Sequence, residues 1–123
     1  ERDITIDQKK RMYNIANIDY KKYKNSVDAI VLHVDDIDSV KSIKDFDFVE
    51  VKATKKKSVH KLPYNVFFGF TKNEEELFKT CENYKLCFVH VSLKKYYFIN
   101  YSEYCDLIHS KRIQYQITFK KND

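Results

Sequence analysis

Apolar and polar positions repeat with two different periods along the chain, and each period predicts a different kind of element. Apolar residues recur three and four positions apart from Met12 to Tyr23, with lysines spread over the other positions. This spacing predicts a helix of about 18 residues with one buried face. Thr5 and Gln8 have the spacing of a capping box, in which two side chains satisfy free backbone donors at the start of a helix.

Runs of β-branched and aromatic residues predict the strands. Residues 27–34 are expected to form a well-buried strand with Asp28 at its head. Residues 46–52 alternate, so that Glu50 and Lys52 share a face with two phenylalanines while two valines occupy the other face. Further strands are predicted at 65–70, 86–92, 95–100 and 113–119.

Two more helices separate these strands. Thr71 to Glu74 forms a second capping box, and the helix that follows it is expected to end near Asn83. Ser102 is expected to cap a short helix that runs to about His109. The resulting order, α, β, β, β, α, β, β, α, β, predicts an α/β domain with a central mixed β-sheet flanked by helices.

The length and composition fit one globular domain. The chain has 123 residues, of which 43% are hydrophobic and 33% are charged, which is enough apolar surface for one packed core. We expect residues 1–123 to form a single domain, and a start at Glu1 without Met suggests a fragment of a longer chain. A single Gly and a single Pro exclude glycine-rich phosphate-binding loops, and with them Walker-type ATPases and dinucleotide-binding folds.

The charge balance points weakly to a polyanionic partner. The chain carries 23 Lys and Arg against 18 Asp and Glu, a net charge of +5, which favours nucleic acid. Its three cysteines are odd in number and lack metal-binding spacing, so we expect reduced thiols in the cytoplasm or another reducing compartment. No apolar run approaches the length of a membrane span, and no membrane association is expected.

Charged residues within apolar strands carry the candidate chemistry, because a buried charge is costly unless it is paired or bound to a metal. If the first two strands are antiparallel neighbours, Asp28 lies near Glu50, with Lys52 beside them. Two carboxylates and a backbone carbonyl, that of Val51, suit Mg²⁺ or Mn²⁺. Lys52 could then orient a water molecule or stabilise a phosphate under attack, which is the equipment for phosphodiester hydrolysis.

At these residues the sequence resembles the PD-(D/E)xK nuclease superfamily, which has a restriction-endonuclease-like core. The matching segments are Val27 to Leu32 and the tripeptide Glu50-Val51-Lys52, and the order of elements after the tripeptide is similar to that of Mrr-like and NO VEIN-type members. The resemblance implies that Asp28 and Glu50 are metal ligands and that Lys52 is the catalytic lysine. It implies a Mg²⁺-dependent endonuclease, with DNA favoured over RNA.

The first metal ligand remains open at this stage. Val27 stands where a proline commonly precedes the first acid of the family, and a long connection separates Asp28 from Glu50. Three other acids on that connection, Asp35, Asp36 and Asp45, are alternatives. Asp47 is a poorer candidate, because alternation turns it to the face opposite Glu50.

The segment after the tripeptide is basic. Lys55, Lys56, Lys57 and Lys61 could bind the phosphate backbone of a nucleic acid, although a lysine run is often only a solvated loop. Three alternatives to the DNA endonuclease remain: a non-catalytic nucleic-acid-binding or assembly module of the same fold, a viral cap-snatching type of RNA endonuclease, and a plain interaction domain. The sequence also leaves open a homodimer and further domains of a larger protein.

Overall fold

The computed structural model describes residues 4–122. Its helices are α1 (Ile6–Ile15), α2 (Tyr20–Tyr23), α3 (Lys72–Thr80) and α4 (Tyr101–Leu107), and its strands are β1 (Ala29–Leu32), β2 (Phe46–Thr54), β3 (Tyr84–His90) and β4 (Lys95–Ile99). Two short 3₁₀ turns, Ile37–Ser39 and Ile43–Asp45, lie in the connection between β1 and β2.

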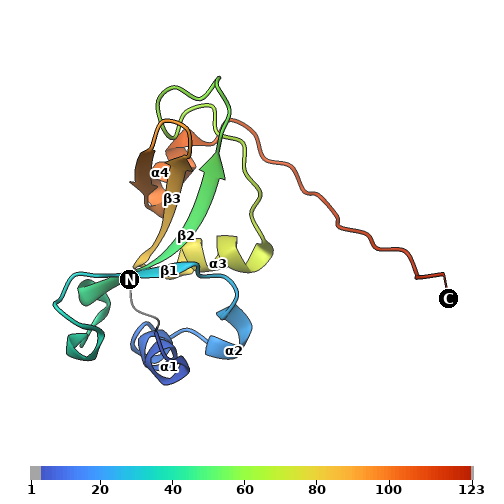
Figure 1. Ribbon diagram of the computed structural model, residues 1–123. Helices are drawn as coiled ribbons and strands as arrows, with labels where there is room; N and C mark the ends of the chain where they lie inside the picture. The colour runs from blue at the N-terminus through green and yellow to red at the C-terminus, as the bar shows by residue number, and fades with distance from the viewer. Residues whose placement is uncertain (1–3, 123) are drawn as a thin grey trace.

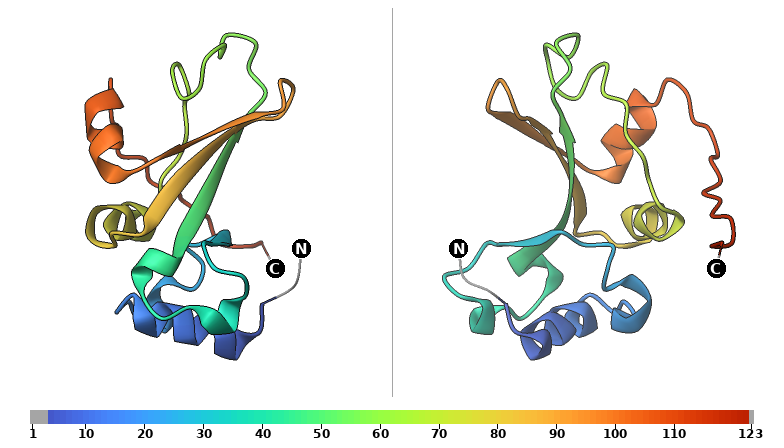
Figure 2. Two further views of the ribbon diagram at one scale, coloured as in Figure 1. Left: turned by 90° about the vertical axis from the view of Figure 1, so that its left-hand side faces the viewer. Right: turned by 45° about the vertical axis from the view of Figure 1, so that its right-hand side comes forward.

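The four strands form one mixed sheet in the order β1-β2-β3-β4. The central pair, β2 and β3, is parallel, and each of these strands has an antiparallel neighbour on its outer side. Helices α1 and α2 lie at one end of the sheet, and α3 and α4 lie together on one side of it (Figures 1 and 2). The prediction of an α/β domain with a mixed sheet flanked by helices is therefore confirmed.

The core lies on the face of β2 that carries Phe46 and Phe48, both of which are fully buried. The ring of Phe48 is 5.0 Å from that of Tyr13 on α1, and Phe88 on β3 is equally far from Phe68. Aromatic rings in these tilted and edge-on arrangements contribute packing beyond the apolar area that they bury. The strand and α1 are thus joined through aromatic contacts.

The first helical segment is shorter than predicted. The capping box of Thr5 and Gln8 is confirmed, but α1 ends at Ile15. Asn17 then adopts a left-handed backbone conformation with φ of 57°, and Asp19 caps the separate helix α2. Asparagine tolerates this conformation better than most residues, and it terminates helices for that reason. The apolar spacing that runs on to Tyr23 belongs to two helices that face the same core.

Three predicted strands differ in the structure. Strand β1 has only four residues, 29–32, and lies at the edge of the sheet, where the side chain of Val31 is 38% exposed instead of well buried. The segments 65–70 and 113–119 form no strand. Alternation is only half of what a strand requires, because its backbone also needs a partner. The C-terminal segment extends away from the sheet and pairs with none of the described residues (Figure 1).

The remaining predicted helices form with small shifts at their ends. The capping box of Thr71 and Glu74 is confirmed, and α3 ends at Thr80 instead of near Asn83. Helix α4 begins two residues earlier than expected, because Asn100 and Glu103, not Ser102, make its capping box. Among the described residues, no helix is long and apolar enough to cross a membrane.

Candidate functional site

Asp28 and Glu50 come together because β1 and β2 are antiparallel neighbours in the predicted register. Ala29 pairs with Val49, and the backbone N–H of Asp28 donates to the carbonyl of Val49. Asp28 immediately precedes Ala29, so that its side chain lies on the same side of the sheet as Glu50. The backbone N–H of Val51 donates to Asp28 Oδ2 at 2.7 Å, which fixes the carboxylate beside β2.

Lys52 places its ammonium group between two glutamates. Lys52 Nζ is 3.3 Å from Glu50 Oε2 and 3.0 Å from Glu74 Oε1. It also lies 5.3 Å from the centre of the Phe70 ring, over the aromatic face. The lysine side chain is only 14% exposed, so these interactions are shielded from solvent and hold it more firmly than a surface ion pair would.

Glu74 is a member of the site that the sequence interpretation missed. Its place at the third position of α3 was recognised only as part of a capping box, and the structure confirms that its carboxylate accepts from the backbone N–H of Thr71 at 3.0 Å. The same oxygen accepts from Lys52. The sequence did show that Glu74 caps a helix. It did not show that the first turn of α3 packs against the sheet, which buries this carboxylate beside Lys52. We call Asp28, Glu50, Lys52 and Glu74 the acidic site.

The three carboxylates are not equivalent. Burial, followed by the proximity of Glu74 and then Asp28, raises the pKa of Glu50 to about 8. Burial also acts to raise the pKa of Glu74, but hydrogen bonds with Glu50, the Thr71 backbone and Lys52 outweigh it and lower that pKa overall. Neighbouring acids whose environments separate their pKa values are frequent in functional sites, although structural ion-pair networks show the same behaviour.

Tyr84 lies beneath the acidic site and was also missed. Its side chain is almost fully buried, and its hydroxyl donates to the carbonyl of Ser26 at 2.5 Å. Burial raises the pKa of Tyr84, and the carboxylates of Glu50, Glu74 and Asp28 raise it further. The tyrosine therefore lies close enough to feel the charge of all three acids, and its hydrogen bond holds the chain two residues before Asp28. Its position follows from the parallel pairing of β2 and β3, which no local pattern reveals.

Asp28 and Glu50 offer carboxylate oxygens, the type of ligand that Mg²⁺ prefers in proteins. Glu50 Oε1 is buried and accepts no hydrogen bond from the described residues, an arrangement that costs free energy unless another group binds the oxygen. The backbone of Val51 faces Asp28 beyond the end of β1. Within the described part of the chain, no three His, Cys, Asp or Glu side chains are arranged as a metal cage. Mg²⁺ commonly binds through one or two carboxylates, so a cage of three is not required.

The other acids considered as a first ligand have different roles. Asp36 and Asp45 accept hydrogen bonds from the backbone of the two 3₁₀ turns, and these bonds lower the pKa of Asp45. Asp47 lies on the opposite face of β2, 2.9 Å from His33. Asp35 is exposed in the connection between β1 and β2. Of these candidates only Asp28 contributes to the site.

The basic residues lie in the segment that leaves the end of β2 just after the acidic site. Lys55, Lys56, Lys57 and Lys61 are all exposed, and none of them takes part in an ion pair within the described residues. The segment forms the loops beyond the tip of β2 in Figure 1. Exposed cations that form no ion pair attract polyanions, because each neutralised phosphate releases condensed counterions.

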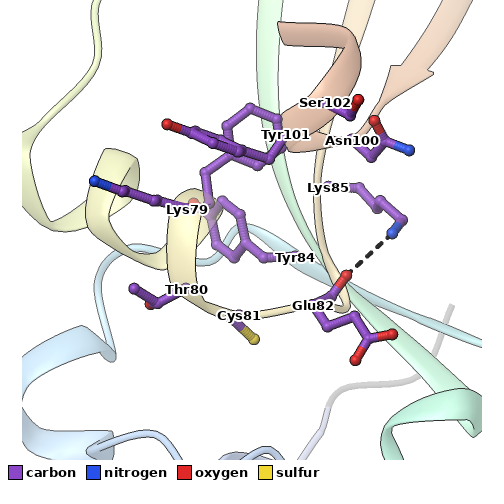
Figure 3. Close-up of a pocket in the computed structure, with 10 residues that line it drawn as sticks. Lys79, Thr80, Cys81, Glu82, Tyr84, Lys85, Asn100, Tyr101 and Ser102 are labelled. Atoms are coloured by element: carbon purple, nitrogen blue, oxygen red, sulfur yellow. Dashed lines mark hydrogen bonds between the residues drawn. The ribbon is translucent and has the colours of Figure 1, made fainter. Parts of the chain in front are cut away.

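A separate pocket lies between the end of α3 and the start of α4 (Figure 3). Its volume is about 480 Å³, and its rim includes Lys79, Lys85 and Tyr101. The ammonium group of Lys85 donates to the carbonyl of Glu82. Because none of the residues of the acidic site lines this pocket, it supports no role in the same chemistry.

Comparisons with protein-family models, curated proteins and solved structures found no match to the chain. The function is therefore argued from the geometry of the acidic site and its surroundings.

Proposed function

We propose that the domain is a metal-dependent endonuclease with a restriction-endonuclease-like core of the PD-(D/E)xK type, acting on phosphodiester bonds with DNA as the favoured substrate. The observation that carries the proposal is the convergence of Asp28 and Glu50, from two strands, beside the ammonium of Lys52. The orphaned oxygen of Glu50 adds to it, because a cation would satisfy that atom.

In this proposal Asp28, Glu50 and the carbonyl of Val51 would hold Mg²⁺ or Mn²⁺. When bound, the ion would activate a water and neutralise negative charge on the phosphate. Glu50 would have to give up its proton, because only the carboxylate form is a good ligand. Lys52 would orient the water or stabilise the attacked phosphate, and its contact with Glu74 would hold the ammonium in place during that step.

The cleavage test compares the wild type with Lys52→Ala. We expect Mg²⁺- or Mn²⁺-dependent cutting of mixed DNA and RNA substrates by the wild type, and a loss of at least about 100-fold in the variant, in line with removal of one charge-stabilising group. Lys85→Ala is a matched control, because Lys85 is a lysine of the neighbouring strand whose side chain lies on the other face of the sheet. Equal products from wild type and Lys52→Ala would exclude the assigned role of Lys52.

A second candidate, a non-catalytic nucleic-acid-binding or assembly module, is favoured by the contacts that Lys52 already makes. Both glutamates contact its ammonium group, and Glu74, whose pKa is lowered, supplies the negative charge. Within the described residues, the buried polar atoms of the cluster therefore have partners, apart from Glu50 Oε1. In such a module Glu50→Ala should leave nucleic-acid binding unchanged, and the wild type should cut no substrate with either metal. RNA in the same assay tests the cap-snatching type of activity.

A further inference from the structure

The most uniformly basic part of the chain also carries exposed aromatic rings. From residue 51 to residue 73 the sequence contains no acidic residue. Within this stretch, the side chain of Phe67 is 83% exposed and that of Tyr64 is 54% exposed. We call residues 55–70 the basic aromatic loop. The exposed ring of Phe67 is therefore accessible to a partner outside the domain, in a stretch whose charged residues are all basic.

The basic aromatic loop is fixed to the body of the domain at three points. Val59 is almost fully buried. The ring of His90 lies 3.1 Å from the carbonyl of Lys56, and because its other nitrogen accepts from the N–H of Leu93, the nitrogen facing Lys56 is the donor. Phe68 packs on Phe88 with 5.0 Å between ring centres. These contacts hold the backbone of the loop in a fixed position relative to the sheet, so the exposed side chains have defined positions as well.

The exposed rings and the cations are interleaved. Lys56 Nζ lies 5.7 Å from the centre of the Phe67 ring, and neither Lys55 nor Lys57 forms an ion pair within the part of the chain that the structure describes. Phe67 directly precedes Phe68, whose side chain is fixed against β3, so the outward direction of Phe67 is set by its neighbour. Cations that follow a phosphate backbone, together with aromatic faces on which bases stack, are the two features that proteins use to bind single strands.

The loop is continuous with the acidic site. Its last residue, Phe70, lies 5.3 Å from Lys52 Nζ and 5.5 Å from the ring of Phe68. The segment that carries Phe67 therefore continues to a residue in contact with the acidic site. Paired bases are stacked on one another and cannot stack on a protein ring unless they are extruded, so rings exposed on a loop favour unpaired bases.

We propose that the basic aromatic loop binds single-stranded or locally unpaired nucleic acid, with Phe67 stacking on a base and Lys56 with its neighbouring lysines contacting phosphates. This inference rests on the proposed function for its choice of nucleic acid as the ligand. It goes further by naming the strand structure of the substrate and the ring that recognises it.

The test is binding without cleavage, measured by fluorescence anisotropy in EDTA. A labelled 20-nucleotide single strand is compared with its blunt duplex for the wild type, Phe67→Ala and Phe67→Tyr. We expect the wild type to prefer the single strand, Phe67→Ala to weaken that binding by about tenfold, and Phe67→Tyr to keep it, because tyrosine still offers a stacking face. Lys56→Gln should reduce the salt dependence of binding to both substrates.

Phe119→Ala is the matched control, because it removes an equally exposed phenylalanine from the C-terminal segment. Thermal unfolding of each variant verifies that the fold is kept. Equal binding of the single strand by wild type and Phe67→Ala, a preference for duplex, or no binding to either substrate would overturn the inference. Cutting lost in Lys52→Ala with no effect of Phe67→Ala would refute the loop alone, whereas stacking-dependent binding with no cutting would refute the nuclease proposal alone.

Discussion

One face of β2 contains two regions of opposite character. Phe46 and Phe48 at its start are fully buried in the aromatic core, whereas Glu50 and Lys52 at its end are nearly as buried but carry ionisable groups. The strand does not change its geometry between the two halves, since its register with β3 continues unbroken from Phe48 to Thr54. The buried rings of the first half therefore stabilise the domain. The buried ionisable groups of the second half lower its stability, because burial removes them from water.

The largest expected effect comes from the apolar half. Phe48→Ala should lower the free energy of unfolding by about 3–5 kcal/mol, because it removes a fully buried ring and leaves a cavity. Urea unfolding followed by circular dichroism measures the change. Phe119→Ala, in the exposed C-terminal segment, should change stability by less than about 0.5 kcal/mol. A similar loss in both variants would show that the C-terminal segment is packed in solution.

The charged half of β2 should make the free energy of unfolding depend on pH. The pKa of Glu50 is raised from the ordinary value of 4.5 to about 8, so between these values the folded state binds a proton that the unfolded state has released. The contribution of Glu50 to stability should therefore be fully present below about pH 4.5 and be lost as the pH rises to about 8, by at most about 1.4 kcal/mol per pH unit. Glu74 has a lowered pKa and so acts in the opposite direction, but only at more acidic pH.

Glu50→Gln isolates this effect, because the amide keeps the shape of the protonated carboxyl and does not titrate. Unfolding in EDTA at several pH values between 5 and 8.5 should show a decline in the wild type and a flat profile in the variant. The variant should be the more stable of the two at pH 8. A decline of the same slope in both proteins would mean that another group is responsible.

The smallest expected effect compares the two threonine capping boxes. Thr5→Ala and Thr71→Ala should each cost about 1 kcal/mol, since each removes an acceptor at a helix start. Only Thr71→Ala should also reduce metal-dependent cutting, because its box orients Glu74 against Lys52. If both variants keep full cutting, the capping of α3 is structural only.

The sequence predicted the two halves of β2 but not everything that surrounds them. Alternation identified the shared face of Phe48, Glu50 and Lys52, and the antiparallel pairing placed Asp28 correctly. These are local or nearest-neighbour features, which period and register determine.

Other parts depended on contacts that no local pattern encodes. Glu74 enters the acidic site through the packing of α3, and Tyr84 through a parallel pairing between distant segments. Conversely, Ile117 and its alternating neighbours have the pattern of a strand, yet Ile117 is 77% exposed because no strand of residues 4–122 pairs with the segment. An alternating sequence is therefore not sufficient for a strand. Whether the segment forms one depends on pairing with a neighbouring strand, which the local sequence does not determine.

The hairpin register between β1 and β2 has a consequence for which changes the domain can tolerate. Insertions in the connection that contains the two 3₁₀ turns only lengthen a surface loop, and they should lower the free energy of unfolding little. One residue gained between Phe48 and Glu50 would turn the glutamate and the lysine to the other side of the sheet and bring two valines in their place. Variation in length should therefore accumulate before Phe46 and be rejected within β2.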